Sequence, residues 1–268
     1  MPMNAVAAED LVLRYGATTA LAASSFTIPA GSITAVIGPN GSGKSTILSA
    51  IAGLLAPASG RLDVGLDSIA YVLQTTKVND ALPVTVREVV SMGRYATTGA
   101  YRWLSADDRR SVDDAIERMD LHDVAGRHLH ELSGGQRQRV FVAQGLAQDH
   151  DLLLLDEPLT GLDLPSALAI DRVIHDEQAH GCTVVLTTHD LAEAQAADHV
   201  ILVAGRVVAA GTPDTVLDIT NLASAYGPAL LHGEDERIYL DDPLLLEDPA
   251  HRPVPGRHLH RGRRSDEL

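Results

Sequence analysis

The sequence predicts an α/β fold in which a mostly parallel β-sheet is covered by helices on both faces. Short, continuous apolar runs have the length and composition of buried strands, and helical stretches at about 165–179 and 190–197 separate the later ones. A glycine-rich loop follows the first run directly and leads into a helix. The runs occupy residues 33–37, 152–155, 183–187 and 199–203.

The residues before the loop favour strands, and residues 86–148 favour helices. Residues 11–14 and 20–28 are expected to be short strands before the turn 29–31. After the loop, a helix is expected over 46–55, ending near Gly53, and a hairpin over 61–72. The pattern from 86 to 148 is helical, with Ser105 as an N-cap, and predicts an insertion at the edge of the sheet.

Composition excludes several classes of protein. The 268 residues carry a formal charge of −15, which disfavours a sequence-independent nucleic-acid binder because phosphate neutralisation needs a basic surface. The single cysteine, Cys182, excludes an intrachain disulfide and a multi-cysteine metal site, and it is expected to be a small buried residue. No apolar run has the ~18 residues of a spanning helix and no secretory signal is apparent, so we expect a cytoplasmic protein.

The glycine-rich loop fits G-x-x-x-x-G-K-[ST], with a strand before it and a helix after it. Its glycines let backbone N–H groups converge on phosphate oxygens, and the helix adds its N-terminal partial charge. Lys44 is expected to contact the β- and γ-phosphates and Ser45 to bind Mg²⁺. The candidate phosphate-binding residues are Gly38, Pro39, Asn40, Gly41, Ser42, Gly43, Lys44, Ser45 and Thr46.

Two further motifs carry candidate chemistry. Four leucines place Asp156 and Glu157 at the carboxyl end of a buried strand, where one carboxylate can hold Mg²⁺ and the next can polarise water. Ser133, Gly134, Gly135 and Gln136 form a capped, bare helix N-terminus, which is a second anion site. From spacing alone, a capped helix without a ligand explains the second motif equally well.

Together, in this order, the three motifs resemble those of the nucleotide-binding subunit of an ABC transporter. The resemblance covers about residues 8–227 and implies a P-loop NTPase domain with an antiparallel β subdomain and an inserted helical subdomain at about 86–148. Residues 228–268 form an extension, acidic and then rich in Arg, His and Pro, that we expect to be weakly ordered. Four further residues match positions of the family. The resemblance implies that Tyr15 stacks on adenine and that Gln74 lies in the loop that senses Mg²⁺ and the membrane partner. It also implies that Asp163 contacts the second copy of the dimer and that His189 is the switch histidine that contacts the γ-phosphate.

The resemblance also implies a mechanism. Two copies would close head to tail on two ATP molecules, each between the phosphate loop of one copy and residues 133–136 of the other. Mg²⁺ would be held by Ser45, Gln74 and Asp156. The catalytic set is Lys44, Gln74, Glu157 and His189. Leu73 departs from the family, in which proline commonly precedes the glutamine.

The transported substrate is inferred from the segment that faces the permease. Residues 82–95 resemble ATPases for manganese, zinc and iron-chelate uptake, residues 101–109 resemble the ferric-siderophore branch, and 158–163 resemble the manganese and zinc branch. We therefore expect an importer of zinc or manganese, with iron chelates as the alternative. The expected partners are transmembrane permease subunits and an extracytoplasmic metal-binding protein, at the cytoplasmic face of the membrane.

Other interpretations stay open. A non-transport ABC ATPase is disfavoured because the chain has one nucleotide domain and no long coiled coil, and an efflux ATPase is disfavoured by the permease-facing segment. The tail contains His251, His258 and His260, which could bind metal, although a solvated basic tail explains them better because no carboxylate or cysteine completes a site.

Overall fold

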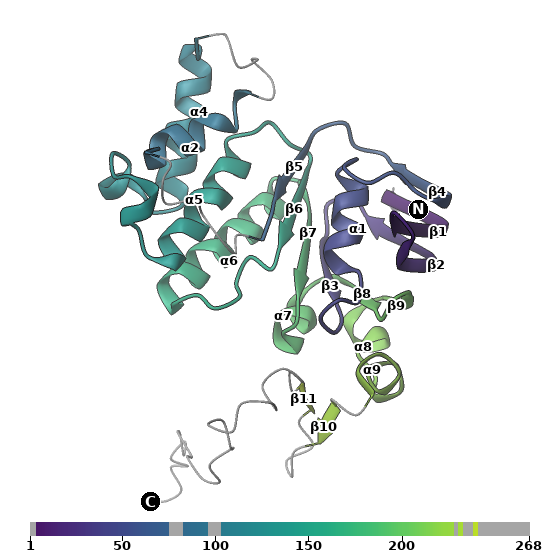
Figure 1. Ribbon diagram of the computed structural model, residues 1–268. Helices are drawn as coiled ribbons and strands as arrows, with labels where there is room; N and C mark the ends of the chain where they lie inside the picture. Colours follow the sequence, from purple (N-terminus) through teal and green to yellow (C-terminus); the bar gives the residue numbers. More distant parts are fainter. Residues whose placement is uncertain (1–3, 75–82, 96–102, 228–229, 233–237, 241–268) are drawn as a thin grey trace, which may run out of the picture. The chain divides into compact units, whose positions relative to one another are not determined.

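The computed structural model describes residues 4–74, 83–95, 103–227, 230–232 and 238–240. The chain divides into two compact units, Met1–Gly227 and Pro228–Leu268. The larger unit contains a six-stranded sheet, a three-stranded sheet and the described helices (Figure 1). In the smaller unit, β10 (Leu230–His232) pairs antiparallel with β11 (Ile238–Leu240). The tail histidines and the order expected of the tail fall outside the described residues.

The six-stranded sheet has the order β5-β6-β7-β3-β8-β9. Its pairs are parallel except β8 with β9, so the sheet is mixed, with an antiparallel strand at one edge. Every residue of β3, β6 and β7 is buried, as expected of strands covered on both faces. The predicted α/β fold is confirmed. The strands are β3 (Ile33–Ile37), β5 (Ile69–Val72), β6 (Leu152–Asp156), β7 (Thr183–Thr188), β8 (His199–Val203) and β9 (Val207–Gly211).

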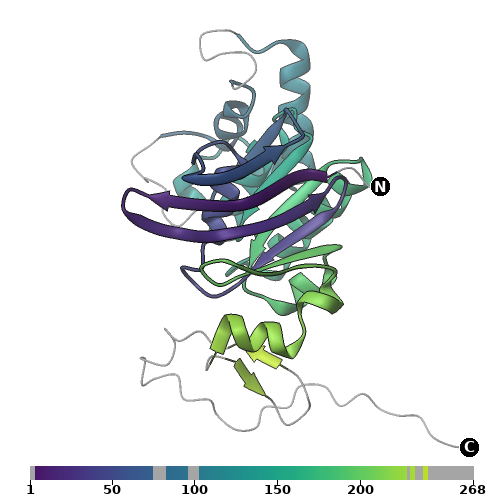
Figure 2. The same cartoon turned by 90° about the vertical axis from the view of Figure 1, so that its right-hand side faces the viewer.

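The three-stranded sheet is antiparallel, with β1 (Asn4–Tyr15) between β2 (Thr18–Pro29) and β4 (Ser59–Val64). Figure 2 displays β1 and β2 as a long hairpin. The hairpin predicted over residues 61–72 is wrong, because β4 pairs with β1 whereas β5 pairs with β6 in the other sheet. The short apolar β5 finds its partner in the four leucines of β6, a long-range pairing that the local turn pattern does not reveal.

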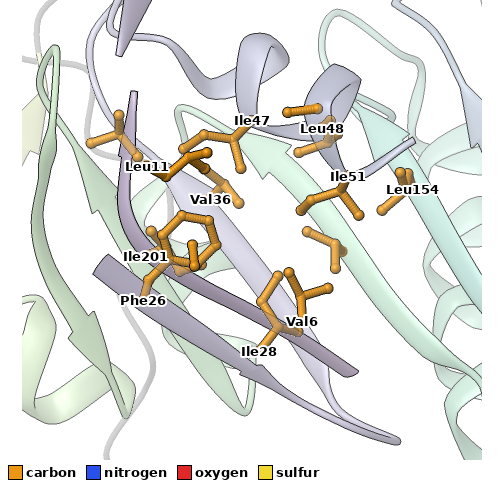
Figure 3. Close-up of a cluster of buried hydrophobic side chains, with 14 of the residues drawn as sticks. Val6, Leu11, Phe26, Ile28, Val36, Ile47, Leu48, Ile51, Leu154 and Ile201 are labelled. Atoms are coloured by element: carbon orange, nitrogen blue, oxygen red, sulfur yellow. The ribbon is translucent and has the colours of Figure 1, made fainter. Parts of the chain in front are cut away.

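A hydrophobic core joins the two sheets through α1 (Lys44–Ile51) (Figure 3). Side chains of α1 such as Ile47 and Ile51 lie between residues of β1 and β2 and residues of the central sheet. Because Ile47 is fully buried, this packing fixes the direction in which α1 leaves the glycine-rich loop. The labelled core residues are Val6, Leu11, Phe26, Ile28, Val36, Ile47, Leu48, Ile51, Leu154 and Ile201.

Helices cover the opposite face of the central sheet, where α5 and α6 lie on the side away from α1 (Figure 1). The helical segment between β5 and β6 contains α2, α4 and α5, which contact one another. Ser105 caps α4, as predicted. Among the described residues, no helix has the length and apolar character needed to cross a bilayer. The helices are α2 (Val86–Met92), α4 (Ala106–Arg118), α5 (Gly134–Leu146), α6 (Leu164–Ala179), α7 (Leu191–Ala196), α8 (Pro213–Val216) and α9 (Ile219–Tyr226).

Candidate functional site

The loop between β3 and α1 is shaped by close backbone approaches. Gly43 has φ of 107°, a conformation that residues with a side chain rarely adopt. A Cβ at Gly43 would lie 2.8 Å from the carbonyl oxygen of Ala20, so β2 and the loop can approach only because this residue is glycine. The loop leads from the buried strand β3 into helix α1, which is the geometry that the G-x-x-x-x-G-K-[ST] motif predicts.

Lys44 is the first residue of α1 and is only 6% exposed. Its ammonium group donates hydrogen bonds to the carbonyl oxygens of Gly38 at 2.8 Å and Pro39 at 3.3 Å. Burial lowers the pKa of Lys44, and the carboxylates of Glu157 and Asp156 partly offset that effect. The two carbonyl oxygens therefore hold the buried ammonium group against the loop. There the same group can donate its hydrogen bonds to phosphate oxygens instead.

Asp156 ends β6 and accepts two hydroxyl hydrogen bonds on one carboxylate oxygen. Ser45 Oγ donates at 3.0 Å and Thr187 Oγ1 at 2.5 Å. Asp156 and Thr187 are paired in register across β6 and β7, and Ser45 reaches them from α1. The carboxylate and the Ser45 hydroxyl form a set of hard oxygen donors at the carboxyl ends of the strands, and Mg²⁺ prefers such ligands.

Glu157 follows Asp156 in a backbone conformation that is uncommon for residues with a side chain, with φ of 48°. Its N–H donates to Thr187 Oγ1 at 2.8 Å, and its carboxylate accepts a 2.7 Å hydrogen bond from the amide of Gln74. The tight turn directs the Glu157 side chain into the same cleft as the loop instead of along the strand. A carboxylate in this position can polarise a water molecule beside a phosphate.

Lys44, Ser45 and Glu157 line one open cleft with a volume of about 460 Å³. The hydroxyl of Ser42, one of the lining residues, is buried and has no hydrogen-bond partner among the described residues. A buried orphan hydroxyl, a buried ammonium and the backbone of a glycine-rich loop together suit a polyphosphate ligand. The cleft is lined by Ala20, Asn40, Gly41, Ser42, Gly43, Lys44, Ser45, Thr46, Gln74 and Glu157.

Two sequence-predicted residues lie near the cleft without lining it. Tyr15 is 54% exposed and lies at the end of β1, in the hairpin whose second strand brings Ala20 to the loop. His189 is exposed and directly follows Thr188, which pairs in register with Ile37, the residue before Gly38. Both side chains are therefore free to meet a ligand that extends beyond the cleft.

Residues 133–136 do not line this cleft. Ser133 caps α5, since its hydroxyl accepts the Gln136 N–H at 3.2 Å and its own N–H donates to the Gln136 side chain at 3.0 Å. Ser133 and Gly134 are exposed, so the helix N-terminus is available to a ligand from another molecule. Within one chain, the two predicted anion sites are thus separate surfaces.

Gly135 has a packing role that the sequence did not reveal. A Cβ there would lie 2.6 Å from Ser166 Oγ and 2.9 Å from Asp163 Oδ1. Asp163 itself caps α6 by accepting the Ser166 N–H at 3.1 Å, and this hydrogen bonding lowers the pKa of Asp163. The starts of α5 and α6 are therefore in close contact, and a side chain at position 135 would force Ser166 and Asp163 to shift.

Thr187 is the site residue that sequence reasoning missed. It bridges the Asp156 carboxylate and the Glu157 N–H, so it orients both acidic residues. One feature of the sequence could have indicated this role. Thr187 is a hydroxyl residue near the carboxyl end of a buried strand, and that strand pairs with the strand that ends in Asp156.

A mostly parallel sheet, in which one strand leads into a phosphate-binding loop and another ends in a carboxylate pair, defines a P-loop nucleotide-binding ATPase. The family model described as ABC transporter matches residues 21–160, and the chain belongs to this family. The family resemblance and the predicted ABC-type ATPase class are thereby confirmed.

Curated relatives agree with this assignment. The chain is 40% identical to the chelated iron transport system membrane protein YfeB of Yersinia pestis, over 88% of this chain and 81% of that protein. It is 38% identical both to the manganese transport system ATP-binding protein MntA of Synechocystis, over 79% and 85% of the two chains, and to the zinc import ATP-binding protein ZnuC of Ruegeria pomeroyi, over 83% and 84%.

A solved structure extends the likeness to a nucleotide-bound state. The ATP-binding cassette MJ0796, a dimer bound to ADP and Pi in a post-hydrolysis state, superposes with a TM-score of 0.67 at 26% identity. The match covers 78% of this chain and 98% of that one. The chain therefore shares the fold of a nucleotide-binding cassette.

Proposed function

We propose that this chain is the ATP-hydrolysing, energy-coupling subunit of an importer for a transition metal ion, zinc or manganese. The observation that carries the proposal is the convergence of Lys44 and Glu157 at one cleft, beside an Asp156 that is hydrogen-bonded to Ser45. The relatives of the chain include named manganese and zinc transport ATPases. Glu157 would activate the attacking water, Lys44 would hold the phosphates and His189 would contact the γ-phosphate.

The residues around Asp156 suit Mg²⁺. Ser45 Oγ and the Asp156 carboxylate are oxygen donors already 3.0 Å apart, and Gln74 uses its amide nitrogen on Glu157, which leaves its amide oxygen for a cation. Bound Mg²⁺ would neutralise charge on the phosphates. Asp156 and Ser45 would hold it, with Gln74 as the third ligand.

The exposed helix N-terminus at Ser133 and Gly134 supports a dimeric mechanism. Ser133 and Gly134 would bind the γ-phosphate of an ATP held by a second copy, because they are accessible and do not line the cleft of their own chain. Tyr15 would stack on adenine and Asp163 would act at the dimer contact. ATP would favour the closed pair and ADP would not, since the γ-phosphate contacts both copies.

The expected partners follow from an ATPase that serves a transporter. The chain would bind transmembrane permease subunits as a peripheral protein on the cytoplasmic face of the membrane, and the permease would receive metal from an extracytoplasmic binding protein. Iron chelate is the second candidate substrate, favoured by the 40% identity to a chelated iron transport protein.

The test is uptake in the cells that make this chain. Replacing the gene with the Glu157→Gln variant should abolish uptake of radioactive zinc or manganese, while Glu117→Gln, an exposed acid on α4, should not affect it. Loss of iron uptake alone would identify the chelate branch. Unchanged uptake of all three metals would contradict the transport role.

A further inference from the structure

A cluster of three potential metal ligands lies at the ends of β6 and β7 opposite the nucleotide cleft. His150 precedes β6, Cys182 precedes β7, and Glu177 lies in the last turns of α6. One ligand atom from each residue lies within 4.8 Å of the other two. Asp156 and Thr187, which hydrogen-bond to the cleft residues Ser45 and Glu157, lie at the far ends of the same two strands, so the cluster is separate from the nucleotide cleft.

The cluster has the outer hydrogen bonds of a metal site. His150 Nδ1 donates to the Gln148 carbonyl oxygen at 2.8 Å, which leaves Nε2 facing Glu177 Oε2 at 2.9 Å. The second oxygen of Glu177, Oε1, forms an ion pair with the Arg118 guanidinium at 2.6 Å. Metal-ligating histidines usually bond a carbonyl through their other nitrogen, and ligating carboxylates are themselves hydrogen-bonded. Both ligands are thus already oriented.

Cys182 completes the donor set. Its side chain is buried, and its thiol makes a weak 3.4 Å contact with the Thr183 carbonyl oxygen and also interacts with the His150 ring. A shift of a few tenths of an ångström would bring Nε2 and Oε2 from 2.9 Å to the ~3.3 Å that tetrahedral zinc bonds impose. Gly181, which precedes Cys182, and Asp151, which follows His150, are both exposed. The ligand atoms therefore lie just beneath the surface.

We propose that His150, Glu177 and Cys182 form a zinc-class metal site in this subunit. A nitrogen, an oxygen and a thiolate sulfur suit Zn²⁺, with water in the fourth position, and thiolate ligation disfavours Mn²⁺. The bound ion would join the starts of β6 and β7 to the end of α6. The site is independent of which metal the transporter carries.

Cobalt provides a direct test because the chain has a single cysteine. Adding Co²⁺ to the untagged, metal-free full chain should produce a thiolate-to-cobalt charge-transfer absorption, which Zn²⁺ then removes by displacement. Cys182→Ser, a nearly isosteric change, should eliminate the absorption and one equivalent of zinc binding measured against a chromogenic chelator. His150→Gln should weaken zinc binding at least ~10-fold, because it removes the imidazole ligand.

Two controls separate this site from other histidines. The double variant His175→Gln, His180→Gln changes exposed residues near the same end of α6, and His251→Gln, His258→Gln, His260→Gln removes the tail histidines. Both should retain the absorption. Absence of the charge-transfer band in wild type, or zinc binding unchanged by Cys182→Ser, would overturn the proposal and leave a metal-free ion cluster of His150, Glu177 and Arg118.

Discussion

The side-chain amide of Gln74 donates a 2.7 Å hydrogen bond to the carboxylate of Glu157. Gln74 follows β5 and Glu157 follows β6, so the bond joins the carboxyl ends of two neighbouring parallel strands. The chain after Gln74 leads into the helical segment, so a displacement of Gln74 by that segment would release the Glu157 side chain. The residue proposed to activate water is therefore hydrogen-bonded to Gln74, from which the chain continues toward the segment expected to face the permease.

Glu157→Gln is expected to lower ATP turnover by about 10²–10⁴-fold and to leave ATP binding nearly unchanged. The amide cannot accept a proton from water, whereas Lys44 and the loop that bind phosphate are untouched. Steady-state hydrolysis and the dissociation constant for ATP measure the two effects separately. Glu117→Gln on α4 is the matched control. Turnover at the wild-type rate in Glu157→Gln would show that another residue activates water.

Gly135→Ala is expected to destabilise the fold, whereas Gly134→Ala is not. A Cβ at Gly135 would meet Ser166 and Asp163 within 3 Å, and such overpacking costs about 1–3 kcal/mol. A Cβ at Gly134 has no atom within 4 Å, so alanine fits at this first position of α5 without a clash. Urea unfolding of both variants checks the contrast. Equal stability of the two would mean that α5 can move away from α6.

Much of this fold was predictable because its strands are short, apolar and locally marked. The strands predicted at 33–37 and 152–155 were found from their continuous apolar runs, and glycine at the loop marked the helix that follows. The 61–72 hairpin failed because the pairing of β5 depends on β6, which lies about 80 residues further along the chain. Local turn chemistry does not encode that choice.

The candidate site was partly predictable for a different reason. Lys44, Ser45 and Asp156 belong to motifs with fixed spacing, so the sequence named them before any packing was known. Thr187 and the cluster around Cys182 were not found, because their roles depend on strand register and on a helix returning to the sheet. Cys182 is buried as expected, but it lies beside His150 and Glu177 instead of among apolar groups alone.

Asp108 is expected to contribute stability that is lost in acid. Hydrogen bonds from Ser105 and then from Arg94 lower the pKa of Asp108 from 3.8 to about 2. Because the folded pKa is the lower one, the stabilisation is complete above about pH 4 and disappears as the pH falls toward 2. The loss should be visible as a shrinking difference between wild type and Asp108→Asn.

The measurement is the free energy of unfolding of wild type and Asp108→Asn in urea from pH 7 to pH 3. The difference should be constant between pH 7 and 5 and should decrease below pH 4. Asp107→Asn, an exposed acid in the same helical turn, should give a smaller difference. A difference for Asp108→Asn that stays constant down to pH 3 would assign the effect to packing of the buried Arg94 and not to charge.

Ser133 offers a way to separate helix capping from phosphate binding. Aspartate is as good an N-cap as serine, so Ser133→Asp should keep α5 folded and the melting temperature nearly unchanged. Its negative charge would repel a γ-phosphate presented by a second copy. In a Glu157→Gln background, light scattering should detect an ATP-dependent dimer with Ser133 and with the neutral cap of Ser133→Thr, but not with Ser133→Asp. Dimers of equal strength in all three proteins would show that Ser133 does not contribute to the shared site. A chain that stays monomeric with Ser133 intact would contradict the shared site itself.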